Sequence, residues 1–235
     1  MSSSRGGKKM WCVAEIDEKY VSNMEDVLAT YELPLSCEEP VVCLDEKPIQ
    51  LLNNINSTSR LVRRDRPRRK DYEYQRMGTA NAFCIVEPKR GRYMVKVTKN
   101  RKAPQFAEAL RDIGRAYPAA RKIHLVMDNL STHTRKSLID HLGPKRGANL
   151  WNRFEVHYTP KHGSWLNQAE IAISMFSRGC LGKDRIATCA TLAKRAAAWT
   201  CRMNEEQRKI DWRFTRAKAR KKFGYDPAKS PDGRH

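Results

Sequence analysis

The sequence predicts an α/β fold in which a mixed sheet is flanked by helices. Stretches rich in β-branched and aromatic residues alternate with stretches in which apolar residues recur at helical spacing. Their order along the chain is strand, hairpin, helix, strand, helix, strand, helix. Strands and helices in this order form one sheet with helices packed on its faces. The 235 residues are enough for one sizeable core with extensions.

Each element of the N-terminal half follows from periodicity and from residues that end helices or strands. Apolar residues recur at helical spacing from residue 15 until Pro34, which predicts a helix. The segment PVVCLDEKPIQL predicts a short buried strand whose apolar run ends at Asp45. The two β-rich runs around the turn EPKRG, in TANAFCIVEPKRGRYMVKVTK, predict the hairpin.

The C-terminal half continues this alternation. APQFAEALRDIGRAY predicts an amphipathic helix, and RKIHLVMDN predicts a second buried strand that ends in an acid, Asp128. STHTRKSLIDHLG has polar capping residues at its start and Gly143 at its end, which predicts a helix. RFEVHYTP alternates as a strand, a helix with Ser164 as its N-cap follows, and TLAKRAAAWTCRMNEEQ predicts the last helix.

The charge of the chain indicates a polyanionic partner. Its 46 Lys+Arg against 26 Asp+Glu give a net charge of +20, and nucleic acid is the first candidate, although ribosomal and membrane-surface proteins share this signature. Two tracts concentrate the charge, RLVRRDRPRRK and RFTRAKARKK. The residues predicted to contact DNA phosphates are Arg60, Arg63, Arg64, Arg66, Arg68, Arg69, Lys70, Arg216, Lys218, Arg220, Lys221 and Lys222.

Other classes of protein and site are disfavoured. No apolar run is long enough to cross a bilayer, and the first residues lack the apolar segment of a secretory signal. The seven cysteines are odd in number and scattered without a C-x-x-C pair. This usage predicts reduced thiols in a cytoplasmic protein and argues against a zinc site.

Three acidic residues are candidates for one site. Asp45 and Asp128 each end an apolar run, and adjacent strands of one sheet would bring their carboxylates together. Glu170 lies on the mostly apolar helix that follows, on a narrow polar stripe with Asn167 and Ser174. Each acid alone is compatible with an ordinary turn, cap or solvent-facing position. The three together predict a catalytic site.

Carboxylates that converge repel one another unless a cation lies between them. Oxygen-only ligands suit Mg²⁺ or Mn²⁺, and two such ions about 3.5–4 Å apart promote phosphodiester cleavage. Asp45, Asp128 and Glu170 are therefore the predicted metal ligands. Glu46 receives no metal role because side chains alternate along a strand, and Trp165 is expected in the core. Candidates for hydrogen bonds around the metal ligands are Asn129, His133, His162 and Asn167.

Four segments, VVCLDEKPIQL, KDYEYQRMGTAN, VMDNLSTHT and HYTPKHGSWLNQAEI, resemble the catalytic domain of bacterial insertion-sequence transposases in the mariner-like superfamily of DDE transposases. The resemblance runs from about residue 11 to about residue 219. It implies an RNase H-like fold and a DDE triad, Asp45, Asp128 and Glu170, that binds two Mg²⁺ or Mn²⁺ ions. It also implies cleavage at transposon ends, strand transfer into target DNA at TA dinucleotides, and a homodimer or larger assembly on DNA.

The chain departs from this family in two ways. Forty-one residues separate Asp128 from Glu170, which is longer than usual and is explained by an insertion around GPKRGANLWN. Complete relatives carry an N-terminal helix-turn-helix region. We therefore expect a split reading frame, a truncated remnant or a trimmed fragment, with a separate helix-turn-helix polypeptide as a candidate partner.

The expected organisation is a disordered basic tail at 1–10, a helical lead-in at 11–40, a catalytic domain at 41–205 and a basic extension at 206–235. The expected location is the cytoplasm, on the nucleoid of a bacterium. Two alternatives stay open: an RNase H-like nuclease without strand transfer, and a catalytically inactive DNA-binding remnant.

Overall fold

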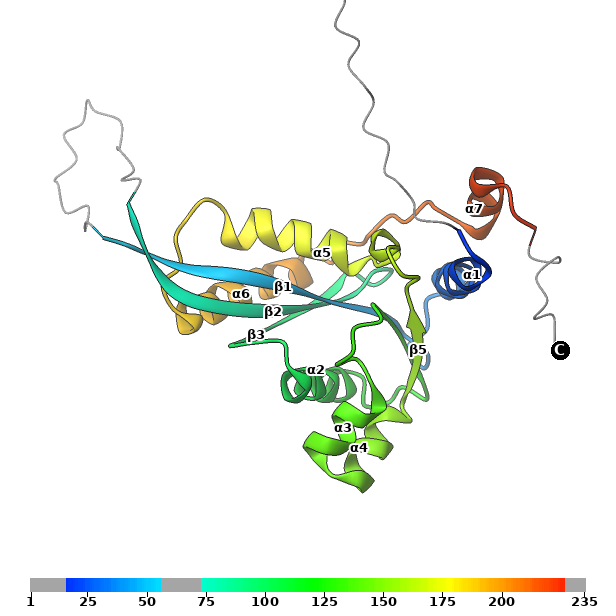
Figure 1. The fold of residues 1–235 in the computed structure, drawn as a ribbon, viewed down its shortest axis with the longest axis horizontal. Helices are drawn as coiled ribbons and strands as arrows, with labels where there is room; N and C mark the ends of the chain where they lie inside the picture. The colour runs from blue at the N-terminus through cyan, green and yellow to red at the C-terminus, as the bar shows by residue number, and fades with distance from the viewer. Residues whose placement is uncertain (1–15, 56–72, 227–235) are drawn as a thin grey trace, which may run out of the picture.

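The fold is built on a five-stranded mixed sheet. The computed structural model describes residues 16–55 and 73–226 (Figure 1). The strand order is β3-β2-β1-β4-β5, and the strands are β1 (Val41–Asn54), β2 (Tyr74–Glu87), β3 (Arg92–Thr98), β4 (Ile123–Met127) and β5 (Phe154–Tyr158). The predicted α/β fold with a mixed sheet is confirmed. The predicted tail at 1–10 and the tract from Arg60 to Lys70 lie outside the described residues.

The sheet is antiparallel on one side and parallel on the other. β1 pairs antiparallel with β2, and β2 with β3, as the predicted hairpin requires. β1 pairs parallel with β4, and β4 with β5. The parallel strands are joined by helical segments, because a parallel connection must cross back over the sheet.

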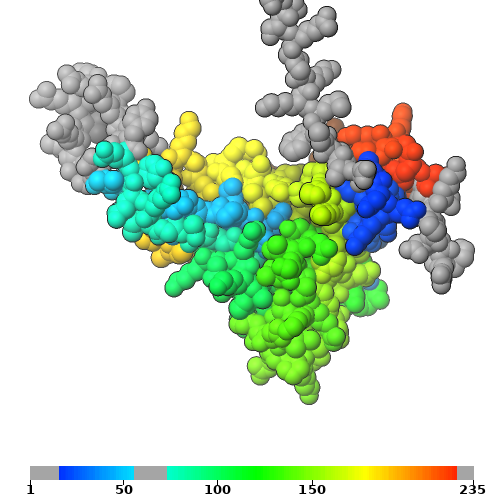
Figure 2. Space-filling model, viewed as in Figure 1, coloured from blue at the N-terminus to red at the C-terminus, as the bar shows by residue number. Residues whose placement is uncertain are grey.

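Helices cover both faces of the sheet (Figure 1). The face below the sheet in Figure 1 carries α2 (Ala103–Ala116), α3 (Arg135–Leu142) and α4 (Pro144–Trp151). The other face carries α1 (Glu18–Glu32), α5 (Ala169–Phe176) and α6 (Cys189–Glu205), and α7 (Arg216–Phe223) lies beside α1. The far ends of β1 and β2 project at one end of the molecule (Figure 2).

Two apolar clusters, one on each face of the sheet, hold these layers together. Successive side chains of β1 belong to one cluster and then to the other. Val42 and Leu44 pack with α2 and α3, whereas Cys43 packs with α1 and α5. Successive side chains of a strand point to opposite faces. The side chains of Asp45 and Glu46 therefore lie on opposite faces of the sheet.

The strand that carries Asp45 is longer than the sequence predicted. β1 does not end there: it continues to Asn54, with Lys47 opposite Ala82 and Asn54 opposite Tyr74. β4 pairs with β1 only as far as Cys43, so no strand of the described part pairs with this edge of β1 at Pro48, where a proline is tolerated. The polar residues and the proline after Asp45 concealed this extension, because they interrupt the apolar run from which the strand was predicted.

The helix that carries Glu170 begins later than predicted. Ser164 starts a short 3₁₀ turn, Ser164–Leu166, and α5 follows with Gln168 as its N-cap, so Glu170 lies in the first turn rather than the second. Trp165 was expected in the core but is 39% exposed, and its ring meets Phe214 edge-on.

Two helices were not predicted. α4 occupies the expected insertion, and Pro144 at its start favours the first helical turn. α7 lies beyond the helix that was predicted to be the last, capped by Thr215. None of the helices in the described part has the length and apolar character needed to cross a membrane.

Candidate functional site

Asp45 is held in the middle of the sheet. It lies opposite Cys84 of β2, and its Oδ1 accepts a hydrogen bond from the backbone N–H of Glu46 at 2.7 Å. Burial, with the charges of Glu170 and Asp128, raises the pKa of Asp45 to about 7. At neutral pH, the surroundings therefore destabilise the ionised form of this carboxyl group.

The strand register places Asp128 beside Asp45. Cys43 of β1 pairs with Val126 of β4, and each acid lies two residues beyond its member of this pair. Asp128 directly follows β4, as predicted. Parallel strands in this register present both carboxylates at the same level of the sheet.

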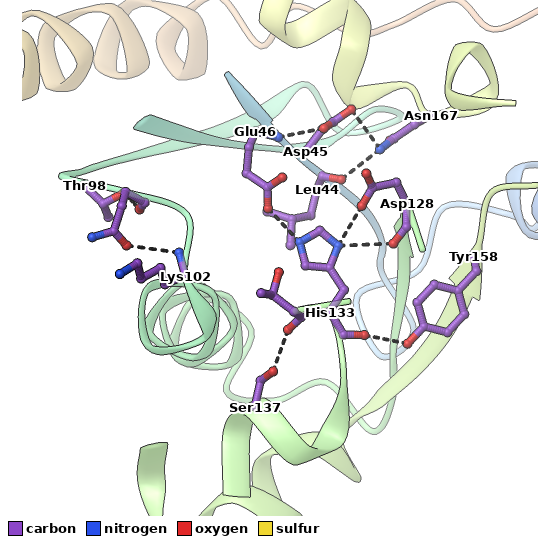
Figure 3. Close-up of polar contacts among 12 residues, drawn as sticks. Leu44, Asp45, Glu46, Thr98, Lys102, Asp128, His133, Ser137, Tyr158 and Asn167 are labelled. Carbon is purple, nitrogen blue, oxygen red and sulfur yellow. Dashed lines mark hydrogen bonds and ion pairs between the residues drawn. The ribbon is translucent and has the colours of Figure 1, made fainter. Parts of the chain in front are cut away.

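Hydrogen bonds around the start of α5 tie the segment that carries Glu170 to β1 next to Asp45. Asn167 donates from its side-chain amide to the carbonyl of Leu44 at 2.8 Å and to Oδ2 of Asp45 at 3.4 Å (Figure 3). The hydroxyl of Tyr31 on α1 donates to the carbonyl of Leu166 at 2.9 Å. These bonds tie α5 to β1 and α1, and Glu170 follows Asn167 by three residues.

The start of α5 is also electrostatically suited to an acid. The first turn of a helix carries partial positive charge from its unpaired N–H groups. Glu170 lies in this turn, and its side chain is exposed. Its charge is among the causes that raise the pKa of Asp45, so the two carboxylates interact.

His133 connects Asp128 to a fourth acid. Its Nδ1 lies 2.7 Å from Oδ1 of Asp128, and its Nε2 lies 2.7 Å from Oε1 of Glu46 (Figure 3). Burial lowers the pKa of His133, but the two carboxylates raise it to about 9 overall. Burial raises the pKa of Asp128, and the hydrogen bond from His133 lowers it below its usual value.

The alternation argument placed Glu46 on the correct face but overlooked this contact. Among the described residues, the ligand atoms of Glu46, Asp128 and His133 lie within 4.8 Å of one another. Glu46 and His133 are 87 positions apart in the chain. The sequence analysis named His133 as a candidate for hydrogen bonds to the metal ligands, but it did not predict the contact between His133 and Glu46.

The other residues predicted to lie around the metal ligands differ in whether they contact the three acids. Asn167 contacts Asp45. Asn129 and His162 are exposed, and no hydrogen bond or ion pair within the described part joins His162 to the three acids. His162 has a positive φ of 62°, unusual for a residue other than glycine.

The C-terminal basic tract contacts the protein itself. Arg216 pairs with Glu32 at 2.8 Å, and Arg220 pairs with Glu25 at 2.7 Å, both on α1. Lys218 donates to the carbonyl of Arg213 at 2.7 Å. Part of this positive charge therefore fastens α7 to α1, and DNA contact by the tract stays a prediction.

A second group of candidate ligands is satisfied without a metal. Nδ1 of His124 and Nε2 of His157 are 3.0 Å apart, and Glu155 lies nearby. The two ring centroids are 5.3 Å apart and the ring planes are inclined by 26°. With the nitrogens only 3.0 Å apart, the rings meet edge to edge, each with a nitrogen directed at the other ring. This is the geometry of an N–H···N hydrogen bond, and Asp26 accepts from Nδ1 of His157 at 2.8 Å.

The residues around Asp45 do fit a divalent cation. The donor set of Asp45, Asp128 and Glu170 consists of carboxylate oxygens, which hard cations prefer. Burial, followed by the charges of Glu170 and Asp128, raises the pKa of Asp45, and a cation beside the carboxylate would lower that pKa again. These three residues could therefore hold Mg²⁺ or Mn²⁺.

Comparison with known proteins supports this fold. A solved structure described as "Mos1 transposase paired-end complex with left transposon end" has a TM-score of 0.54 at 17% identity, over 88% of this chain and 64% of that chain. The "Mos1 mariner paired end complex with Mn" has a TM-score of 0.56 at 17% identity, over 88% of this chain and 62% of that chain. The chain thus spans less than two thirds of these proteins, and the likeness confirms the RNase H-like fold.

A search of curated proteins gives no match. The family described as "DDE superfamily endonuclease" matches residues 40–193, a span that contains Asp45, Asp128 and Glu170 and more than half of the 235 residues. Membership in such a family implies a divalent metal. By this match, the chain belongs to the DDE superfamily endonucleases.

Proposed function

We propose that the chain is the catalytic domain of a transposase that cuts DNA at transposon ends and joins the ends to target DNA. The observation that supports this proposal is the strand register that sets Asp45 beside Asp128, together with the charge of Glu170 acting on the Asp45 carboxyl group. The relatives of similar fold are described as Mos1 transposase complexes with a transposon end or Mn. This description supports DNA as the substrate.

Asp45, Asp128 and Glu170 are the proposed ligands of two divalent cations. When bound, such ions activate a water or a 3′-hydroxyl and stabilise the leaving oxygen of a phosphodiester. Asp45 on β1, Asp128 after β4 and Glu170 on α5 would supply the carboxylate oxygens. Asn167 keeps the carboxylate of Asp45 oriented and keeps α5 against β1.

The DNA partners follow from the same proposal. Transposon ends and a TA target would be brought together by a homodimer or a larger assembly of chains, with end recognition by a helix-turn-helix region. The insertion-sequence context, the bacterial source and a place on the nucleoid belong to this proposal too. The net charge of +20 favours close approach of two DNA segments.

The test is cleavage and joining of supercoiled plasmid with Mg²⁺ or Mn²⁺ by the wild-type chain and by Asp45→Asn, Asp128→Asn and Glu170→Gln. Each substitution should lower the rate at least about a hundredfold, because it removes a charged ligand and keeps the side-chain shape. Asp140→Asn, at an exposed position of α3, is the matched control and should leave the rate unchanged. Activity that survives in the three variants would contradict the proposed ligands.

The family description also favours a second candidate, a nuclease that hydrolyses DNA without joining it. Joined products distinguish the two, because hydrolysis yields only nicked or linear plasmid. Wild-type chain that binds DNA without cutting calls for a helix-turn-helix polypeptide in the assay. Continued inactivity with it would favour an inactive DNA-binding remnant.

A further inference from the structure

Glu46 is a buried acid whose position invites an explanation. Its side chain is 1% exposed, on the face of the sheet opposite Asp45. A buried carboxylate is costly unless it is paired and hydrogen-bonded. Its one ion pair among the described residues is with Nε2 of His133, at 2.7 Å.

His133 is fixed from every side. Its ring is 1% exposed and stacks on Phe106, with ring centroids 4.5 Å apart and planes at 23°. Its backbone N–H donates to the carbonyl of Leu130 at 2.8 Å, and its own carbonyl accepts from the hydroxyl of Tyr158 at 2.8 Å. The ring therefore has one orientation, with one nitrogen toward each acid (Figure 3).

This orientation determines the position of Asp128. Nδ1 of His133 reaches Oδ1 of Asp128 at 2.7 Å and the carbonyl of the same residue at 3.1 Å. Asp128 follows the end of β4, where no strand pairing holds its side chain. A close ion pair at one oxygen of a carboxylate restricts where the other oxygen can point.

We propose that Glu46 is a positioning residue for the metal site: it orients His133, which in turn orients the Asp128 carboxylate toward the cation. The inference rests on the proposed function, because it takes Asp128 as a metal ligand. Residues that orient metal ligands by hydrogen bonds typically contribute about 10–100-fold to metal affinity or activity. Glu46 would thus act on the site from the opposite face of the sheet.

A purely structural role for Glu46 makes a different prediction. A buried pair that only packs α2 and the β4–α3 connection against the sheet would affect stability and leave metal affinity alone. The proposal can therefore be tested by comparing a variant that loses the hydrogen bond with a variant that loses only packing. Phe83 is the matched control position, because it lies directly opposite Glu46 in the β1–β2 register and is fully buried.

The experiment measures Mn²⁺ affinity of the full chain by electron paramagnetic resonance of the free ion, together with thermal unfolding in EDTA. Glu46→Leu keeps the volume but removes the acceptor, and should weaken Mn²⁺ binding about 10–100-fold. Glu46→Gln still offers an oxygen to Nε2–H of His133 and should stay within about threefold of wild type. Phe83→Leu should lower the unfolding temperature without changing Mn²⁺ affinity.

Three outcomes would overturn the proposal. Wild-type affinity in Glu46→Leu would show that Asp128 needs no such orientation. Equal weakening in Phe83→Leu would show that general packing, and not the hydrogen bond, is responsible. Mn²⁺ binding that Asp128→Asn leaves intact would refute the metal site of the proposed function itself, and the positioning role with it. Loss in Asp128→Asn with retention in Glu46→Leu refutes the positioning role alone.

Discussion

Asp45 shows at the level of one residue how the fold prepares a site. Its strand is paired on one side with β2 and ends its pairing with β4 two residues earlier, so the carboxyl group is half-buried at the sheet's parallel edge. Burial and the nearby acids raise its pKa to about 7. The same features that disfavour its charge in the metal-free protein favour a cation.

This strain predicts a pH dependence of stability in the metal-free chain. The folded pKa of Asp45 lies above its usual value of 3.8, so the folded state binds the proton more tightly than the unfolded state. Stability should therefore fall as pH rises from about 4 to about 7 and stay low above that. Asp45→Asn should abolish this decrease and stabilise the protein in EDTA at pH 8 by about 2 kcal/mol.

Urea unfolding in EDTA at pH 5 and pH 8 measures the effect. Asp140→Asn serves as control, because its carboxylate is exposed and pairs with Lys136 on the same helix. If the free energy of unfolding differs between pH 5 and pH 8 by the same amount in Asp45→Asn as in wild type, another group is responsible for the pH dependence.

Helices α1 and α7 show how elements far apart in the sequence support one another. Arg220 reaches the carboxylate of Glu25 with its Nε at 2.9 Å and its Nη2 at 2.7 Å, and the hydroxyl of Tyr225 donates to the same carboxylate at 2.6 Å. α1 in turn carries Tyr31, which bonds to the segment before α5. The C-terminal helix thus lies against the helix that helps to position Glu170.

Removing this contact should cost a modest amount of stability. Arg220→Ala is expected to lower the free energy of unfolding by about 1 kcal/mol at pH 7, because the two-bond pair is partly exposed. Lys221→Ala, on the same helix, should change it by less than about 0.5 kcal/mol. Equal losses in both variants would mean that loss of charge or helix propensity, rather than the pair, is responsible.

The same contact should depend on pH in the opposite sense to Asp45. Burial raises the pKa of Glu25, but bonds from Arg220 and Tyr225 lower it below its usual 4.5 overall. Its contribution is therefore present above about pH 4.5 and is lost as pH falls through the lower folded value. The stability difference between wild type and Arg220→Ala, measured by urea unfolding, should shrink as pH is lowered below about 4.5.

At the scale of the whole molecule, positive charge is divided between structure and DNA binding. The C-terminal tract is partly committed to ion pairs with α1. The tract from Arg60 to Lys70 lies in the chain between β1 and β2, which project at one end of the molecule. It holds seven basic residues in eleven and is the stronger candidate for DNA phosphates.

Neutralising Arg63, Arg64, Arg68 and Arg69 together to Gln should weaken DNA binding and flatten its dependence on salt. Each lost phosphate contact removes about 0.9 from the slope of log K against log salt. The measurement is fluorescence anisotropy with duplex DNA between about 50 and 200 mM salt. The control variant loses the same charge at exposed positions elsewhere: Lys19, Arg115, Lys194 and Lys209. Equal slopes in both variants would attribute binding to net charge alone.

The elements that carry the three predicted ligands could be located from the sequence, but their boundaries and the contacts between them could not. Periodicity located the elements that carry Asp128 and Glu170, and an acid at the end of a buried strand is a local signal. The extension of β1 past Asp45 and the later start of α5 depend on partners: β2 in one case, Leu44 and Asp45 in the other. Local sequence does not contain these partners, so the boundaries were missed.

The sequence by itself determined the alternation of strands and helices, the excess of positive charge, and three acids suited to a hard cation. These follow from residue type and spacing, which act over a few positions of the chain. The tertiary structure decided that Cys43 lies beside Val126, that His133 joins Glu46 to Asp128, and that Arg220 binds α1 instead of solvent. Such contacts join residues far apart in the chain, and only packing around a common core selects them.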